Sequence, residues 1–376
     1  MGSENCTIGG AQCHYKLAGT GDRAATRLIL SIIVQAITAL FLLLLLTACG
    51  RSDTGPDRIE HYITRLARTL DAHPPEQQIT PVARISAADL MPLPVTRSNI
   101  DVLDFLSLSD CALQINLGRR NSSLGRTASA SQRLLLDLEF LDLAPACIAE
   151  MRSTDRNSLA EQLSIMADSR RSELPISIYN AIFAGPEFQQ FWQMPSTLDD
   201  YPERTSSAIA DTLTRLDTLA ASWLTGDYNT GNMQFEHLLA ELRAGDGGAL
   251  LRAAHIQSAM LAQADAMLVA ASLASPLCSS DLKSPKVEII GNIISRYFVD
   301  DVQRWLADVS KRRHLLMPPI ESLEMRLNAV LPSNYVLWQT MRSQQIEDLA
   351  GASRRHVEAI QYLLRDCSGM AGNTVI

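Results

Sequence analysis

The chain has 376 residues, of which 47% are hydrophobic and 5% aromatic, and its formal net charge is −8. Nucleic-acid affinity comes mainly from Lys and Arg side chains that neutralise phosphates. An acidic chain is therefore a poor nucleic-acid binder, and no nucleic-acid partner is expected.

A hydrophobic stretch follows a basic flank near the N-terminus. Residues 28–47 read LILSIIVQAITALFLLLLLT, with Arg23 and Arg27 just before them. About twenty apolar residues can span a membrane, and a positive flank before an apolar core is typical of a secretory signal. An uncleaved membrane helix is the alternative. The residues before Arg23 exceed the usual length of such a flank, which indicates a translation start further downstream.

The apolar stretch ends at Leu46-Thr47-Ala48-Cys49, which resembles the lipobox of bacterial lipoproteins. The resemblance implies cleavage after Ala48 and a diacylglycerol on the Cys49 thiol. Residues 1–48 are then a cleaved signal segment, and Cys49 holds the chain on the membrane, where each buried methylene contributes about 0.8 kcal/mol. Gly50, in place of Asp, implies export to the outer membrane rather than the inner one, with the domain facing the periplasm.

Residues 49–97 are predicted to hold the lipid anchor, a short helix and a connector. Apolar residues recur at helical spacing between residues 56 and 71, at Ile59, Ile63, Leu66 and Leu70. Five prolines then follow between residues 72 and 97. Proline blocks helix interiors, so this part is predicted to be extended and to lie over the surface of the domain.

Helical patterns fill residues 98–376, the predicted periplasmic domain. Ser98 or Asn99 can cap a helix that runs past Cys111, and Ser129 or Ser131 can cap the next. Four prolines suit the first turns of further helices, namely Pro145, Pro175, Pro186 and Pro202.

The later helices are predicted from apolar faces and turn residues. The ranges are 203–224, a segment ending at Arg243, an Ala-rich helix to about residue 274, one opened by Ser284-Pro285, and a final helix through Ile346, Leu349, Val357, Ile360 and Leu364. No stretch alternates like a strand. The sequence predicts an all-α bundle of about ten helices.

Four cysteines lie beyond Cys49, and an even number in an oxidising compartment indicates two disulfides. Three connectivities are possible. Cys111–Cys147 and Cys278–Cys367 are favoured, because each pair then lies within one half of the chain. A metal site is the alternative, but no CxxC or HExxH spacing occurs, and neither a metal nor a cofactor is predicted.

One polar segment interrupts the helical pattern. It contains Arg119, Arg120, Asn121, Ser122, Ser123 and Arg126, followed by Arg133, with no acidic residue between Cys111 and Leu136. Guanidinium groups with amides and hydroxyls suit a carboxylate or phosphate, so these residues are a candidate anion or partner site. In the alternative, Arg120 and Arg126 pair with acids of neighbouring helices, and Asn121 and the serines cap helix ends.

Aromatic residues concentrate at Phe188, Phe191 and Trp192, on one predicted helical face. Core packing is the favoured account of this cluster. A face toward a ligand or partner is the alternative.

Several segments together resemble an uncharacterised family of predicted bacterial lipoproteins, domain of unknown function 3080. They read RNSSLGR, SQRL, ELPISIYNAIFAGPEF, LRAGDGGAL and RHVEAIQYLLRDC. The likeness covers most of the mature chain. It implies lipoprotein character and brings no assigned activity, fold or catalytic residue.

The sequence contains no assembled catalytic motif. It favours a non-catalytic, lipid-anchored envelope protein whose helical domain docks onto or binds another envelope component. A hydrolase or transferase acting on cell-wall or lipid material, with the Arg-rich segment as its anion site, is the alternative. A carrier of an apolar or anionic ligand between helices is a third hypothesis.

Overall fold

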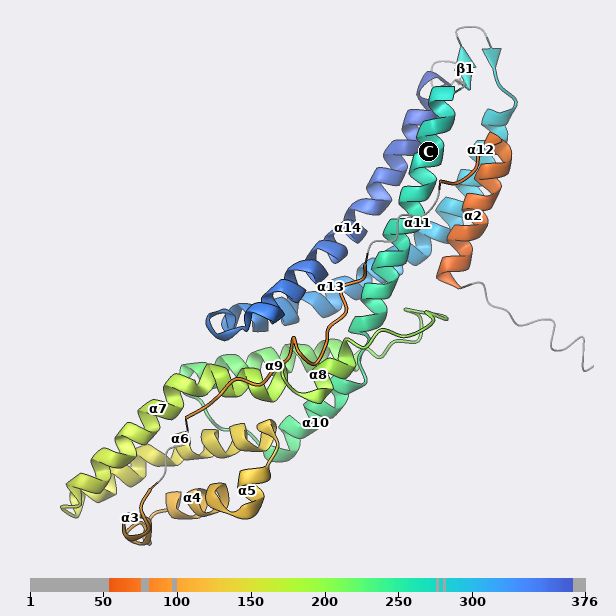
Figure 1. The fold of residues 1–376 in the computed structure, drawn as a ribbon. Helices are drawn as coiled ribbons and strands as arrows, with labels where there is room; N and C mark the ends of the chain where they lie inside the picture. The colour runs from red at the N-terminus through yellow and green to blue at the C-terminus, as the bar shows by residue number, and fades with distance from the viewer. Residues whose placement is uncertain (1–53, 76–80, 97–99, 275–276, 280–281, 368–376) are drawn as a thin grey trace, which may run out of the picture. The chain divides into compact units, whose positions relative to one another are not determined.

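Helices make up most of the described residues in the computed structural model of Figure 1. The structure describes residues 54–75, 81–96, 100–274, 277–279 and 282–367. The predicted signal segment and Cys49 lie outside these residues. The described residues all belong to one compact unit, Asp53–Ile376, and the all-α fold predicted from the sequence is confirmed.

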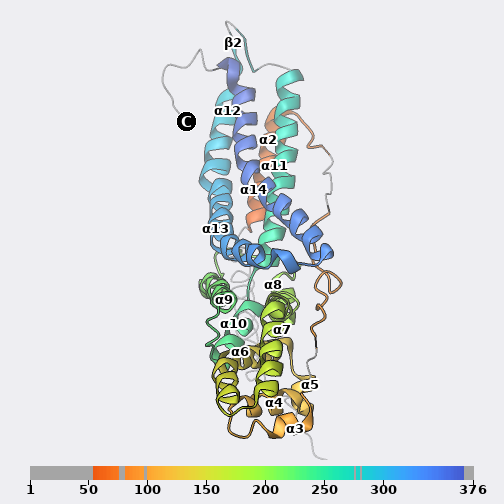
Figure 2. The same cartoon turned by 90° about the vertical axis from the view of Figure 1, so that its left-hand side faces the viewer.

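The helices between residues 102 and 243 differ widely in length. They are α3 (Val102–Leu106), α4 (Leu113–Asn121), α5 (Ser123–Thr127), α6 (Ala130–Ser153), α7 (Asn157–Ile182), α8 (Pro186–Phe191), α9 (Ala208–Thr225) and α10 (Asn232–Arg243). The long helices α6 and α7 pack against each other along their length, and α4 packs on α6. Figures 1 and 2 both show this group side by side.

A second group of helices contains both ends of the described chain. Its elements are α2 (Gly55–Leu70), α11 (Gly247–Ala274), α12 (Lys286–Ile293), the π-helix η1 (Ile294–Val302), α13 (Gln303–Arg326), the 3-10 turns η2 (Asn328–Val330) and η3 (Arg365–Cys367), and α14 (Ser333–Leu364). Helix α11 packs on α14, and α2 packs on α11, α12 and η1. Two strands of two residues, β1 (Cys278–Ser279) and β2 (Leu282–Lys283), form an antiparallel hairpin.

Three of the four predicted proline starts are wrong, namely those at Pro145, Pro175 and Pro202. Pro145 lies inside α6 and Pro175 inside α7. Proline removes one helical hydrogen bond and crowds the preceding turn, but buried apolar residues on both sides of each proline keep the helices continuous. Pro186 begins α8 as predicted. The helix predicted from residue 203 begins only at Ala208.

The helix predicted to run past Cys111 is also shorter than expected. Asp101 caps it, through a side chain that accepts from the backbone amides of Leu103 and Asp104, and it ends at Leu106. At the start of α6 the predicted cap is present, because the Ser129 hydroxyl accepts from the amide of Gln132. The predicted caps Ser98 and Asn99 lie outside the described residues, and the N-cap of α3 is Asp101.

The proline-rich connector lies on the helical domain, as predicted. The indole nitrogen of Trp338 in α14 donates to the carbonyl of Ala83 at 3.0 Å. The side-chain amide of Asn180 in α7 both accepts from and donates to the backbone of Leu93, at 2.7 and 2.8 Å. These bonds satisfy backbone groups that an extended, unpaired segment leaves open, so they hold the connector along α14 and α7.

The aromatic cluster of residues 188–192 belongs to the core. Phe188, Phe191 and Trp192 are buried, and Trp192 stacks edge-on against Trp338 with centroids 5.2 Å apart. The predicted core packing is confirmed. Beside this cluster lies a buried ion pair between Arg342 of α14 and Glu324 of α13, with N–O distances of 2.6 and 2.9 Å.

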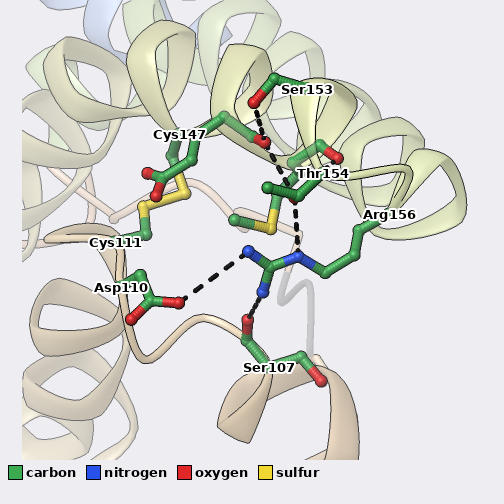
Figure 3. A network of polar contacts seen from close by, with 9 residues as sticks. Ser107, Asp110, Cys111, Cys147, Ser153, Thr154 and Arg156 are labelled. Atoms are coloured by element: carbon green, nitrogen blue, oxygen red, sulfur yellow. Dashed lines mark hydrogen bonds and ion pairs between the residues drawn. A yellow bond between two sulfur atoms is a disulfide. The ribbon is translucent and has the colours of Figure 1, made fainter.

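Both predicted disulfides are present in the structure. Cys111–Cys147 joins the turn after α3 to α6, and Cys278–Cys367 joins the β-hairpin to η3. Figure 3 shows the surroundings of the first bridge. There Arg156 donates to the carbonyl of Ser107 and, at 3.0 Å, to the Thr154 hydroxyl, and lies 4.0 Å from the Asp110 carboxylate. The bridge and Arg156 together fix the turn that replaced the predicted helix.

Among the described residues, one helical stretch, Asn232–Ala274, is long and apolar enough to cross a membrane. Its longer part, α11, packs against α14, α2 and α13. Length and composition alone are weak evidence that a helix spans a membrane, since a buried core helix has the same properties.

Candidate functional site

A hollow of about 300 Å³ lies where the connector, the α4–α5 corner, α6 and α7 meet. This is the lower end of the size range of ligand pockets. Its walls are mainly polar, and the lining residues are Val95, Thr96, Arg120, Asn121, Gly125, Arg126, Arg133, Asp137, Arg170, Glu173 and Ser177. We refer to it below as the arginine pocket.

Two helices supply the floor of the arginine pocket. Arg133 and Asp137 are four residues apart on α6, and Arg170, Glu173 and Ser177 are three and seven residues apart on α7. Residues at such intervals share one helix face. Since α6 and α7 pack along their length, these two polar faces meet across the pocket.

The corner between α4 and α5 brings in the remaining cations. Ser122 ends α4 and caps α5, and its hydroxyl accepts from the amide of Gly125 at 3.0 Å. A Cβ atom at Gly125 would lie 2.2 Å from the Arg119 carbonyl oxygen and 2.5 Å from that of Arg120. Only glycine fits such a close approach. The tight corner sets Arg120 and Arg126 on the same hollow.

Asp137 is the buried carboxylate of the pocket. Its Oδ1 lies 3.4 Å from Nε of Arg120 and 3.8 Å from Nε of Arg170. Burial raises the pKa of the Asp137 carboxyl, while the charges of Arg120 and Arg170 act in the opposite direction. Asp137 therefore compensates part of the positive charge that Arg120 and Arg170 bring to the floor.

Glu173 is the second carboxylate, and it is committed to the connector. The backbone amide of Thr96 donates to both of its oxygens, at 3.1 and 3.0 Å, and the Thr96 hydroxyl donates to one of them. This contact closes one side of the pocket. The Glu173 oxygens that accept from Thr96 are also less available to accept from the guanidinium groups of the pocket.

Arg170 is held by packing as well as by charge. Its guanidinium carbon lies 3.6 Å from the centre of the Phe140 ring, a cation–π contact. Burial lowers the pKa of Arg170 to about 10, so the group is still charged at neutral pH. Its Nη1 is buried and has no hydrogen-bond partner among the described residues.

The other two cations of the pocket are less directly compensated, although the charge of Arg133 also acts on Asp137. Within the described chain, Arg126 and Arg133 form no ion pair, and the buried Nε of Arg133 has no hydrogen-bond partner. Four guanidinium groups face two carboxylates, which gives the lining a formal charge of +2. Buried N–H groups without partners are costly, and the uncompensated positive charge of the lining suits an anionic group in the pocket.

The structure brings together part of the predicted anion site. Arg120, Asn121, Arg126 and Arg133 line the arginine pocket. Arg119 lies outside it, because its guanidinium pairs with Glu139 at 2.9 Å. Among the serines, Ser122 caps α5, as the alternative interpretation stated, and Ser123 does not line the pocket.

The sequence interpretation missed the residues of α7 and the acid of α6. Arg170 and Glu173 lie 44 and 47 residues beyond Arg126, and Asp137 lies outside the acid-free interval. No local signal marks them, since their role depends on the packing of α7 on α6. Their helical spacing becomes informative only once this pairing is known.

Comparison with protein families gives a match over residues 59–370 to DUF3080, described as a protein of unknown function. The chain belongs to the DUF3080 family. No curated protein and no solved structure matches it. The DUF3080 region contains α3 to α14 and all the residues that line the arginine pocket.

Among the described residues, no group of three or more His, Cys, Asp or Glu side chains is placed to hold a metal ion. The His237–Glu241 pair on α10 is largely exposed, with an N–O distance of 3.9 Å. An exposed pair of this kind is a weak surface contact. The arginine pocket therefore remains the candidate site.

Proposed function

We propose that the protein is a lipid-anchored envelope protein whose helical domain binds an anionic group, carboxylate or phosphate, of another envelope component. The observation that carries the binding half is the arginine pocket, with its net charge of +2 and its unpartnered buried N–H groups on Arg133 and Arg170. This proposal combines the docking hypothesis with the anion-site hypothesis, because the envelope component that docks carries the anionic group.

The same geometry favours binding over catalysis. Among the described lining residues there is no histidine. The Thr96 hydroxyl does donate to Glu173, but the same carboxylate also accepts from the Thr96 backbone amide, so this contact holds the connector in place. A hydrolase or transferase needs a nucleophile in hydrogen-bond reach of a base. Ser177 is the remaining hydroxyl of the lining, and no hydrogen bond joins it to Asp137 or Glu173 in the described structure. The enzyme hypothesis thus has less support than the binding hypothesis.

The pocket is tested by ligand-dependent stability. We expect phosphate, sulfate and citrate to raise the melting temperature of the full chain in detergent, since a ligand at 100 times its Kd adds about 2.7 kcal/mol. Chloride at equal ionic strength should not. The Arg126→Ala/Arg133→Ala double variant should lose the shift, because it removes the two lining cations that form no close ion pair within the described residues.

Arg119→Ala is the matched control. Arg119 belongs to the same sequence segment but pairs with Glu139 outside the pocket, so this variant should keep the full anion-dependent shift. If the double variant and the control respond to the anions equally, the arginine pocket is not the binding site.

The location is proposed from the N-terminal sequence, and two disulfides in the domain agree with an oxidising compartment. We expect the protein to incorporate an alkyne-tagged fatty acid in growing cells and to fractionate with the outer membrane. Cys49→Ala should abolish the label and leave an unprocessed precursor. Equal labelling of the wild type and Cys49→Ala would contradict the proposed anchor.

A further inference from the structure

We propose that the arginine pocket selects a phosphate monoester in its dianionic form. This inference rests on the proposed function and narrows it, because that function alone allows any carboxylate or phosphate. Three features support it: the charge of the lining, the placement of its N–H donors on separate walls, and the engagement of its two carboxylates with Arg120, Arg170 and Thr96.

The charge of the lining matches a dianion. Arg120, Arg126, Arg133 and Arg170 face Asp137 and Glu173, for a formal +2. A single carboxylate would leave one positive charge uncompensated in a half-buried hollow, which is unfavourable at low dielectric. A phosphate monoester carries between −1.5 and −2 near neutral pH and neutralises the lining.

The donors come from different walls of the pocket. Arg133 on α6 and Arg170 on α7 each present a buried N–H without a partner among the described residues. Arg126 and Asn121 are exposed and lie at the α4–α5 corner. A planar carboxylate has two acceptor oxygens in one plane, whereas a phosphate monoester has three oxygens on a tetrahedron. Donors on separate walls therefore fit phosphate better.

The protonation of phosphate predicts that binding depends on pH. The second pKa of a phosphate monoester is about 6, so the dianion fraction rises roughly fourfold between pH 5.5 and 7.5. The four arginines stay charged over this range. Asp137 and Glu173 are the titratable acids that face the ligand, and a proton gained by either as pH falls would strengthen anion binding. They therefore act against the expected trend and cannot produce it.

The experiment is calorimetric titration of the full chain in detergent at pH 5.5 and 7.5. We expect glycerol 3-phosphate to bind about fourfold more tightly at pH 7.5. Sulfate is a dianion at both values, so its affinity should stay level or fall with rising pH. Lactate, a monoanion at both, should bind at least tenfold more weakly than glycerol 3-phosphate at pH 7.5.

Asp137→Asn is a matched variant of the same size. It removes one competing carboxylate from Arg120 and Arg170, so it should tighten both glycerol 3-phosphate and sulfate by roughly threefold to tenfold. The fourfold pH response to glycerol 3-phosphate should persist in this variant, because it belongs to the ligand.

The phosphate can belong to a soluble molecule or to a lipid headgroup. Dihexanoyl phosphatidic acid carries the same monoester as glycerol 3-phosphate with two short acyl chains. Tighter binding of the lipid, with the same pH response, supports the inference and assigns a membrane source. Equal affinities support it and assign a soluble source.

Two results would overturn the inference. Lactate binding as tightly as glycerol 3-phosphate, with no pH response, would leave an anion site that does not select phosphate, and the proposed function would stand. If neither phosphate, sulfate nor lactate binds, or if Arg126→Ala/Arg133→Ala binds them as well as the wild type, the proposed function fails together with the inference.

Discussion

Replacing Arg342 with methionine should lower the free energy of unfolding by about 3–5 kcal/mol. Arg342 is fully buried and forms two hydrogen bonds to Glu324, which is also buried. Tyr335 and Gln339 donate to the same carboxylate, at 2.6 and 2.7 Å. Without Arg342, the buried Glu324 carboxylate is left with two neutral hydrogen-bond donors, which compensate its negative charge incompletely. Urea unfolding followed by tryptophan fluorescence measures the change.

The control is the Arg342→Met/Glu324→Gln double variant. A glutamine still accepts from one of the donors Tyr335 and Gln339 through its single side-chain oxygen. No charge is left unpaired, so much of the lost stability should return. A double variant as unstable as Arg342→Met would show that packing of Arg342 between Trp192 and Trp338, rather than its charge, carries the effect.

Removing the Cys278–Cys367 bridge should cost about 4.6 kcal/mol in the chain-entropy model, because it closes a loop of 89 residues. The Cys111–Cys147 bridge closes 36 residues and should cost about 3.8 kcal/mol. Both pairs are replaced by serine, each pair in a separate variant, and the free energies of unfolding are compared with that of the wild type.

The variant without Cys278–Cys367 should lose more stability than the variant without Cys111–Cys147. A larger loss for Cys111–Cys147 would mean that its local contacts, among them the Arg156 network of Figure 3, depend on the bridge. No loss in either variant would contradict a structural role for the disulfides. Treatment of the wild type with a reductant should reproduce the combined loss.

The sequence predicted the fold where local patterns decide it. Ile59, Ile63 and Leu66 recur at helical spacing and are buried in α2. Gly226, with φ of 99°, ends α9 close to the predicted helix end at residue 224. Prolines misled the prediction, because Pro145 and Pro175 have the same sequence signature as Pro186. Only tertiary packing tells a proline inside a helix from one at its start.

The candidate site was predictable only in its contiguous part. The Arg-rich segment is visible because four arginines occur without an acid, and three of them, Arg120, Arg126 and Arg133, line the pocket. The sequence did not distinguish Arg119, since a single residue step rotates a side chain by about 100° around the helix. Arg170 and Glu173 reach the pocket through the pairing of α6 with α7, which one sequence does not reveal.

The N-terminal helix and the connector find their partners almost at the other end of the chain. Tyr62 of α2 bonds His356 of α14 across 294 residues at 2.9 Å, and Ala83 bonds Trp338 across 255 residues. Synthesis runs from the N-terminus, so the apolar face of α2 is made long before α14 exists to cover it. Contacts of such high sequence separation form late and slowly. The folding rate of this protein should therefore be set by the arrival and docking of its last helix, and until then α2 is the segment most exposed to aggregation.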